Sequence, residues 1–330
     1  MEITINEKIP VKKSKTLLEN IVFINASMEG IYITECNPER IIKYKVDGEV
    51  KDEGTIAIKS DYLSIFGYPL TIKNTTRNIT LSGAGVQIKI PYLRDVNEPQ
   101  LPNDYGDNVY KIEREFFKKI NLPDLEKTIL EIDSNELKIT AIHSIEMYQL
   151  TIPISSQTQN TDKKQIILKN LECFREIIEK SNANKFSLHF NEEKLIVTSE
   201  DSIAIINTIG IPIPEYNSVI EKNSKLVTGT IQVNTEQIQT ALEIANFIAE
   251  QVDLKIKENL LQIEGKSEKG EFGPCIFTEA IGEGRGTYNS ERLKKATQYF
   301  KENIQIMLGD SSPIVFKGGD LTYILAPIAT

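Results

Sequence analysis

Few side chains in this sequence are placed to carry out catalysis, and the first candidate is a glycine-rich segment. Residues 281–291, IGEGRGTYNSE, place Gly282, Gly284 and Gly286 between an expected strand and an expected helix. Backbone N–H groups in such a position can hold a phosphate group. The segment lacks the lysine of a phosphate-binding loop, and its glycine spacing is not that of a dinucleotide-binding fingerprint. We therefore interpret it as the flexible connection between two structural units.

The sequence also gives little indication of residues for nucleophilic or acid–base catalysis. The chain has two histidines, His143 and His189, and no Ser-His-Asp or Cys-His arrangement can be built around them. His189 falls within a strand pattern, and His143 is interpreted as a structural residue. The adjacent carboxylates Glu192 and Glu193 fall in an expected hairpin turn, where both are solvated. We therefore expect no catalytic residues and no enzymatic activity.

The cysteines and the absence of long apolar segments argue against metal-binding, disulfide-bonded and membrane proteins. Cys36, Cys173 and Cys275 lie too far apart for a local metal knuckle, and three cysteines cannot form an even disulfide framework. We expect reduced core cysteines in a cytoplasmic protein. Neither a signal peptide nor a membrane span is recognisable, so no membrane contact is expected. The sequence predicts no metal and no cofactor.

The charge balance bears on nucleic acid binding. The chain has 38 basic and 47 acidic residues, which give a formal net charge of −9. This disfavours a protein that holds DNA by wide phosphate contact, because that mode needs a basic surface. It does not exclude DNA, because a local basic stripe suffices when something other than net Coulomb attraction retains the polymer.

A weak internal repeat indicates the fold. A pattern of strand, polar turn and strand occurs at residues 21–35, 128–141 and 252–265. Each copy alternates apolar and polar residues with period two, which is typical of an antiparallel hairpin. The copies begin roughly 105 to 125 residues apart, the size of a small domain.

Between these hairpins lies a second kind of half-unit, a helix followed by strands. Residues 168–181 and 289–303 have apolar residues at helical spacing, with Asn289 or Ser290 as an expected N-cap. Residues 60–70 precede two strands in the same way. The sequence therefore predicts six half-units of helix plus antiparallel strands, paired into three α+β domains. The expected domains are residues 1–104, 105–224 and 225–330.

Several segments resemble the bacterial beta sliding clamp, the beta subunit of DNA polymerase III. They are LKITAIHSIEMYQL at 137–150 with the following TIPI, IPEYNSVIEKN at 213–223, and the final stretch that ends in LTYILAPI. Residues 321–327 also resemble the end of proliferating cell nuclear antigen. That clamp has two domains per chain, so six half-units favour the bacterial type.

The resemblance implies a DNA clamp fold and a head-to-tail homodimer that closes into a ring. Helices would line the hole, a continuous sheet would form the outer wall, and closure would remove exposed strand edges. The implied function is a sliding clamp and polymerase processivity factor that encircles double-stranded DNA, with the replicative DNA polymerase and a clamp loader as partners. Because a ring retains DNA topologically, only the hole needs to be mildly basic. The candidate DNA-facing residues are Lys111, Arg114, Lys118, Lys119, Lys169, Arg175, Arg292, Lys294, Lys295 and Lys301.

The resemblance also implies a pocket that binds a short, mainly hydrophobic peptide of partner proteins. The matching residues are Leu125, Ile142, Ile145, Met147, Pro214, Val219, Ile324 and Ala326. This sequence departs from the family at 143–147, where His-Ser-Ile-Glu-Met replaces Asp-Gly-His-Arg-Leu, so Glu146 stands in place of a cation. It departs again at the N-terminus, where the first helix is missing or reduced to residues 11–20.

Two other functions fit the same sequence. One is a monomeric clamp-fold adaptor that binds protein partners without encircling DNA, and the other is a trimeric clamp. The sequence shows candidate strand edges in the first and third domains but not whether they pair, so it does not decide between these alternatives.

Overall fold

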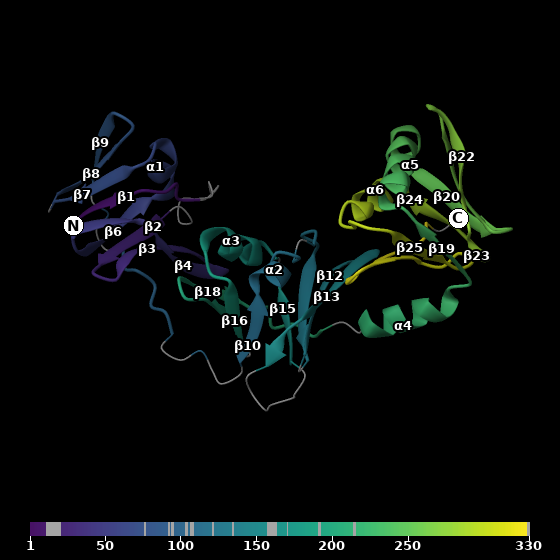
Figure 1. The fold of residues 1–330 in the computed structure, drawn as a ribbon, viewed down its shortest axis with the longest axis horizontal. Helices are drawn as coiled ribbons and strands as arrows, with labels where there is room; N and C mark the ends of the chain where they lie inside the picture. The colour runs from purple at the N-terminus through teal and green to yellow at the C-terminus, as the bar shows by residue number, and fades with distance from the viewer. Residues whose placement is uncertain are drawn as a thin grey trace. The chain divides into compact units, whose positions relative to one another are not determined.

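The computed structural model describes residues 1–10, 21–75, 77–91, 93, 96–102, 105, 109–120, 122–133, 135–156, 164–169, 171–190, 193–213 and 216–328. The chain divides into two compact units, which we describe separately (Figure 1). Unit 1 comprises Met1–Ile120, Ile154–Asp162 and Leu171–Ile209, and unit 2 comprises Asn121–Pro153, Lys163–Asn170 and Gly210–Thr330. The expected remnant of a first helix at 11–20 lies outside the described residues. In the part of the chain that is described, no helix is long and apolar enough to cross a membrane.

Unit 1 is built from antiparallel sheets with three short helices among its described residues. Its elements are β1 Glu2–Ile5, β2 Ile21–Ser27, β3 Gly30–Asn37, β4 Arg40–Val46, β5 Gly48–Asp52, β6 Gly54–Lys59, α1 Ser60–Ile65, β7 Leu70–Asn74, β8 Asn78–Gly83, β9 Val86–Pro91, β10 Val109–Glu113, α2 Arg114–Phe117, β14 Ser155–Ser156, α3 Glu172–Lys180, β16 Lys185–Phe190, β17 Lys194–Thr198 and β18 Ser202–Asn207. One sheet has nine strands in the order β14-β10-β16-β17-β18-β4-β3-β2-β6. The other has five, in the order β5-β1-β7-β8-β9.

Unit 2 repeats this organisation. Its elements are β11 Lys127–Ile132, β12 Glu136–His143, β13 Glu146–Pro153, β15 Lys164–Leu168, α4 Tyr216–Leu226, β19 Gly229–Val233, α5 Thr235–Ile248, β20 Gln251–Lys257, β21 Leu260–Ser267, β22 Gly270–Thr278, β23 Ile281–Gly282, β24 Gly284–Asn289, α6 Ser290–Thr297, β25 Ile304–Leu308, β26 Ile314–Gly318 and β27 Leu321–Leu325. Where residues are described, one sheet has nine strands in the order β15-β11-β12-β13-β27-β26-β25-β19-β23. The other has four, in the order β22-β21-β20-β24.

The three hairpins expected from the repeat are present as β2–β3, β11–β12 and β20–β21. Period-two alternation explains them, because every second side chain of a strand points to the same face. In β20, for example, Val252, Leu254 and Ile256 are buried while the residues between them are exposed. These local patterns were sufficient to predict the hairpins.

Two helices, α5 and α6, begin after an asparagine that caps their N-terminus. Asn289 caps α6 as expected, because its side chain accepts a hydrogen bond from the backbone N–H of Arg292. Asn234 caps α5 in the same way. The helix expected from residue 168 begins only at Glu172, because 164–168 form β15 and pair with β11. The prediction of its start was therefore wrong by four residues.

The glycine-rich segment forms two short strands and connects two sheets of unit 2, because β23 lies in the nine-stranded sheet and β24 in the four-stranded sheet. That this connection is flexible stays a prediction. A Cβ atom added at Gly282 would lie 2.0 Å from the Thr228 carbonyl oxygen, and one at Gly284 would lie 2.6 Å from the Leu308 carbonyl oxygen. The backbone of this segment therefore packs against neighbouring backbone at a distance that only glycine permits. No phosphate could be accommodated on that side of the segment.

The two nine-stranded sheets share one plan. Each joins a run of five strands, β14-β10-β16-β17-β18 or β23-β19-β25-β26-β27, to a run of four, β4-β3-β2-β6 or β13-β12-β11-β15. We refer to the contact between β4 and β18 as the first junction, and to that between β13 and β27 as the second junction. Within the described part of the chain, the remaining sheets are a run of five strands that ends in β9 and a run of four that ends in β22.

Candidate partner-binding groove and DNA-facing residues

The second junction aligns an apolar row across four strands of unit 2. Ile142 pairs with Met147, Met147 with Ile324, and Ile324 with Val315. Directly opposed residues of antiparallel strands project from the same face of the sheet. Met147, Val315 and Ile324 are each no more than 6% exposed. Three of the sequence-predicted pocket residues therefore lie together, and Val315 is a fourth member that sequence analysis missed.

Helix α4 lies over the same face of this sheet (Figure 1). The Tyr216 hydroxyl at its start donates a hydrogen bond of 2.9 Å to the Glu131 carboxylate, which projects from β11 on the face shared with Ile142. The Val219 side chain on α4 is 47% exposed. The start of α4 is thus held against this face of the sheet, and Val219, a predicted pocket residue, is accessible on the helix.

The remaining predicted pocket residues are distributed around this row. The Ala326 N–H donates a hydrogen bond of 2.9 Å to the Ile145 carbonyl oxygen, so the turn between β12 and β13 is held against the C-terminal segment. Ile145 is 43% exposed, and Leu125, just before β11, is half-buried. Pro214 lies outside the described residues. We call Ile142, Ile145, Met147, Val219, Val315, Ile324 and Ala326 the apolar groove; that they line one peptide-binding groove stays a prediction.

The acidic departure at Glu146 does not charge the apolar groove. Glu146 precedes Met147, so its side chain projects from the opposite face of the sheet, where it forms an ion pair with Arg292 of α6. The Tyr323 hydroxyl donates a 3.3 Å hydrogen bond to the same carboxylate, and the Glu146 side chain is only 10% exposed. Burial, with Tyr148 and the Glu146 charge nearby, raises the pKa of Tyr323 well above its ordinary value. The substitution therefore changes the helix-facing side of the second junction.

The first junction has the same kind of ion pair with the opposite polarity. Arg40 begins β4, and its Nη2 atom lies 2.7 Å from Oε1 and 2.6 Å from Oε2 of Glu176 on α3. The Glu176 side chain is 1% exposed and that of Arg40 is 14% exposed. The strand therefore carries the cation at the first junction, whereas at the second junction Glu146 on the strand faces Arg292 on the helix.

Several predicted DNA-facing cations are engaged within the protein. The Arg114 guanidinium donates hydrogen bonds of 2.7, 3.0 and 2.7 Å to the carbonyl oxygens of Ser181, Ala183 and Ile178, so it caps the C-terminal end of α3. Ion pairs also involve three cations of α6 among the described residues. These are Arg292 with Glu146, Lys294 with Glu243 at 4.0 Å, and Lys295 with Glu291 at 2.6 Å.

The other predicted DNA-facing residues are mostly solvent-exposed. Lys118, Lys119, Lys169 and Lys301 are exposed, and Lys111 and Arg175 are half-buried. Helix α5 contributes no basic residue. That these ten residues face DNA stays a prediction, and the ion pairs of the described residues partly neutralise three of them, Arg292, Lys294 and Lys295.

Cysteines and histidines are not gathered into a reactive centre. No group of three or more His, Cys, Asp and Glu residues in the described part of the chain could hold a metal ion. Cys173 is buried, and burial raises the pKa of its thiol to about 11. Cys36 and Cys275 are only half-buried, so the expectation of core cysteines is wrong for these two. His189 lies on β16, where its Nε2 atom is 3.1 Å from the Thr198 hydroxyl.

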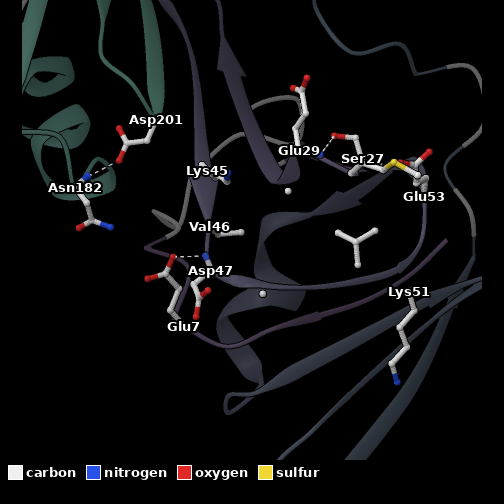
Figure 2. Close-up of a pocket in the computed structure, with 14 residues that line it drawn as sticks. Glu7, Ser27, Glu29, Lys45, Val46, Asp47, Lys51, Glu53, Asn182 and Asp201 are labelled. Carbon is white, nitrogen blue, oxygen red and sulfur yellow. Dashed lines mark hydrogen bonds between the residues drawn. The ribbon is translucent and has the colours of Figure 1, made fainter.

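A polar cavity of about 670 Å³ lies in unit 1 between the β2–β3 turn, the β4–β5 turn and Asp201 (Figure 2). Its carboxylates already accept hydrogen bonds: Asp201 from the Asn182 N–H at 2.6 Å, and Glu7 from the Asp47 N–H at 2.7 Å. Burial alone would raise the pKa of Asp201, but hydrogen bonds from Ser181, Asn182 and Ser199 outweigh it and lower that pKa. We assign no ligand to this cavity.

Comparison with known proteins identifies the fold. No protein-family model and no curated protein sequence matches the chain. The beta subunit of DNA polymerase III from Thermotoga maritima matches with a TM-score of 0.83 and 14% identity, covering 100% of this chain and 99% of that one. The Streptococcus pneumoniae beta chain gives 0.80 and 16% over 100% of both chains. The Helicobacter pylori beta clamp bound to a DNA ligase peptide gives 0.81 and 13%, again over 100% of both. The expected DNA clamp fold is confirmed.

Proposed function

We propose that this protein is a DNA sliding clamp, a non-enzymatic ring that encircles double-stranded DNA in the cytoplasm and tethers the replicative polymerase and other proteins to it. One observation supports the proposal above the others. The chain shares the fold of bacterial beta clamps along its whole length, and its two unfinished sheets are complementary halves of the sheet that it otherwise builds twice.

The unfinished sheets support closure by a second copy. Joining the five strands that end in β9 to the four that end in β22 would give a third sheet of nine strands with the order seen in the other two. Unpaired edges of this kind are normally covered. Val86 at the start of β9, Ile276 on β22 and Phe247 on the neighbouring α5 are 53%, 50% and 80% exposed. A head-to-tail homodimer would complete both sheets and remove this apolar surface from water.

The three-domain organisation is part of the proposal. With boundaries near residues 104 and 224, each nine-stranded sheet combines strands of two neighbouring domains. Sheet formation across these boundaries accounts for two compact units in a chain with three domains. The same arrangement leaves each chain with one unfinished five-stranded sheet, which ends in β9, and one unfinished four-stranded sheet, which ends in β22.

The apolar groove supports the partner function. The H. pylori clamp binds a DNA ligase peptide, and the apolar groove of this chain combines a largely buried apolar row with two accessible apolar side chains, Ile145 and Val219. Such a surface is suited to a short peptide with hydrophobic anchors. We propose that polymerase, ligase and the clamp loader compete for it.

Weak contact with DNA is consistent with this function. The net charge is −9, and several candidate cations are neutralised by neighbours, so phosphate contacts can be few. A closed ring tolerates this, because dissociation requires opening of the ring rather than loss of contacts. The DNA-facing lysines then need only to keep the duplex centred.

Negative-stain electron microscopy and DNA retention test the proposal. We expect closed rings with six lobes, and retention on nicked circular DNA after loading that is lost when the DNA is linearised. Rings with threefold symmetry would replace the dimer by a trimeric clamp. Only monomers, with no retention on circular DNA, would contradict the clamp and favour the monomeric adaptor.

A further inference from the structure

We infer the register of the closing junction: β9 of one copy pairs with β22 of the next in antiparallel orientation, with Lys89 opposite Glu271. The inference rests on the proposed ring function, and it specifies which residues of the second copy complete each unfinished sheet. It is derived from the two internal junctions of the chain.

Both internal junctions use the same register. At the first junction Ser202, the first residue of β18, pairs with Tyr44, which lies four residues after Arg40 at the start of β4. At the second junction Leu321, the first residue of β27, pairs with Leu150, four residues after Glu146 at the start of β13. The corresponding strands of the unfinished sheets are β9 and β22, which also follow tight hairpin turns.

Applying this offset to the start of β22 gives three pairs. Ile90 lies four residues after Val86, the first residue of β9, so the offset of the internal junctions places Ile90 opposite Gly270, the first residue of β22. Lys89 falls opposite Glu271, and Ile88 falls opposite Phe272. Beyond this point β22 has one extra residue, because its register with β21 shifts between Ile263 and Gly265. A bulge of this kind displaces the following pairs by one residue.

After the bulge the same offset places Val86 opposite Cys275. Two residues at the bulge are consistent with an interruption of the pairing between β9 and β22 at this point. Pro274 has no N–H to donate to a neighbouring strand, and Gly273 has a φ of +94°, where a side chain would be strained. The paired stretch is therefore Gly270–Phe272, followed by a resumed contact at Cys275.

The inferred register also pairs residues from matching faces of the two sheets, which is independent support for it. Lys89 pairs with Thr80, so it lies on the solvent face of its sheet, and Glu271 pairs with Lys266 on the solvent face of its own. Ile88 pairs with Leu81, which is fully buried. A slip of one residue would place Ile88 opposite Glu271 and mismatch every pair. The inferred register instead joins charge to opposite charge and apolar to apolar side chains.

Side chains at the second internal junction are more buried than the equivalent side chains at the closing junction of a single chain. The second junction pairs Tyr148 with Tyr323, which are 2% and 0% exposed. The equivalent residues, Ile88 and Phe272, are half-buried before a second copy binds. Beside them, a cavity of about 670 Å³ between α5 and β22 is lined by Ala241, Ile244 and Phe272 among others, and it can receive apolar side chains of β9.

The inferred pair also distinguishes the closing junction from the internal ones. Lys89 and Glu271 occupy the positions of Ile205 and Ile41 at the first junction, and of Ile324 and Met147 at the second. The apolar pair that forms part of the groove at the second junction is therefore replaced by an exposed ion pair. Such a pair is screened by salt, so the closing junction is the one at which salt promotes opening.

Cysteine cross-linking tests the register on the full chain. In a Cys275→Ser background, the Lys89→Cys, Glu271→Cys double variant is oxidised with diamide, and the covalent dimer is measured by denaturing electrophoresis. The matched control is Gln87→Cys with Glu271→Cys, which uses the same face two residues away, where Cα atoms are about 7–8 Å apart. We expect at least about tenfold faster dimer formation for the first variant than for the control, because disulfides need Cα separations below about 7 Å.

Light scattering of the unoxidised variants distinguishes failure of the register from failure of the ring. A homodimer that cross-links faster in the control, or in neither variant, would overturn the register and leave the clamp intact. A protein that is monomeric at every concentration would overturn both the register and the ring. A cross-linked trimer would retain the register and replace the dimeric ring by a trimeric one.

Discussion

Replacement of Arg40 by methionine should destabilise unit 1 far more than its position near the surface suggests. The Arg40 Nη2 atom lies within 2.7 Å of both Glu176 oxygens, and the Glu176 side chain is 1% exposed. Methionine preserves most of the apolar stem of Arg40 but leaves a buried carboxylate without its cation. Removing one partner of a buried ion pair typically costs about 3–5 kcal/mol. Since the Arg40 side chain retains 14% exposure, water can enter after the substitution, so we expect about 3 kcal/mol.

Thermal and urea unfolding of the full chain, followed by circular dichroism, would measure this loss. A change of about 3 kcal/mol lowers the melting temperature of a unit of this size by about 6–12 °C. The double variant Arg40→Met, Glu176→Leu removes both charges and should recover about 1–3 kcal/mol relative to the single variant. A single variant within about 1 kcal/mol of the wild type, or a double variant no more stable than the single, would refute the buried-charge argument.

Three further predictions concern the groove, the polar cavity and the closing junction. Val219→Glu should weaken binding of a labelled hydrophobic peptide about tenfold or more in fluorescence anisotropy, because it places a charge in the proposed groove. The melting temperature should not change, since the Val219 side chain is 47% exposed; equal affinity would exclude Val219 from the groove. Asp201 has a lowered pKa in the folded chain, so its contribution to stability is present above the unfolded pKa of 3.8 and is lost as the pH falls through the folded pKa. In urea unfolding, the wild type should therefore lose its stability advantage over Asp201→Asn below about pH 4. A difference in stability that stays constant with pH would contradict this. Alkylation of Cys275 followed by mass spectrometry should slow on dimerisation while that of Cys36 does not, since only Cys275 lies at the closing junction; equal rates in monomer and dimer would contradict the inferred contact.

Sequence patterns were sufficient where structure depends on neighbours along the chain. Alternation within β20 and the N-cap at Asn289 are local, so the hairpin and the start of α6 could be predicted. The start of α3 could not, because Leu168, the first residue of the expected helix, belongs instead to β15, which forms through pairing with β11. Tertiary pairing therefore decides such segments.

The candidate groove also contains residues that could be predicted from the sequence and others that depend on tertiary pairing. Resemblance supplied Met147 and Ile324, but Val315 belongs to the row only because β26 pairs with β27 in a register that brings it opposite Ile324. The role of Glu146 was equally inaccessible. Its identity as a departure was visible, but its partner Arg292 is 146 residues away in the sequence, and no local pattern connects the two.

The reversed ion pairs give this departure a physical reason. Two junctions built on one plan could exchange partners during folding, and β13 would then meet α3 or β4 would meet α6. The first exchange would place Glu146 against Glu176, and the second would place Arg40 against Arg292. Like charges brought together in partly buried positions are strongly unfavourable. Opposite polarity at the two junctions therefore favours the correct joining of half-units.

The double reversal Glu146→Arg, Arg292→Glu tests this reason directly, because it retains an ion pair at the second junction while giving both junctions the same polarity. Glu146→Arg alone should lower stability by about 2–3 kcal/mol, since the Glu146 side chain is 10% exposed, and the double reversal should restore most of it. If polarity directs joining, the double variant will nevertheless refold from urea with a clearly lower yield of dimer than the wild type. Equal refolding yields would show that the ion pair stabilises the junction without selecting its partner.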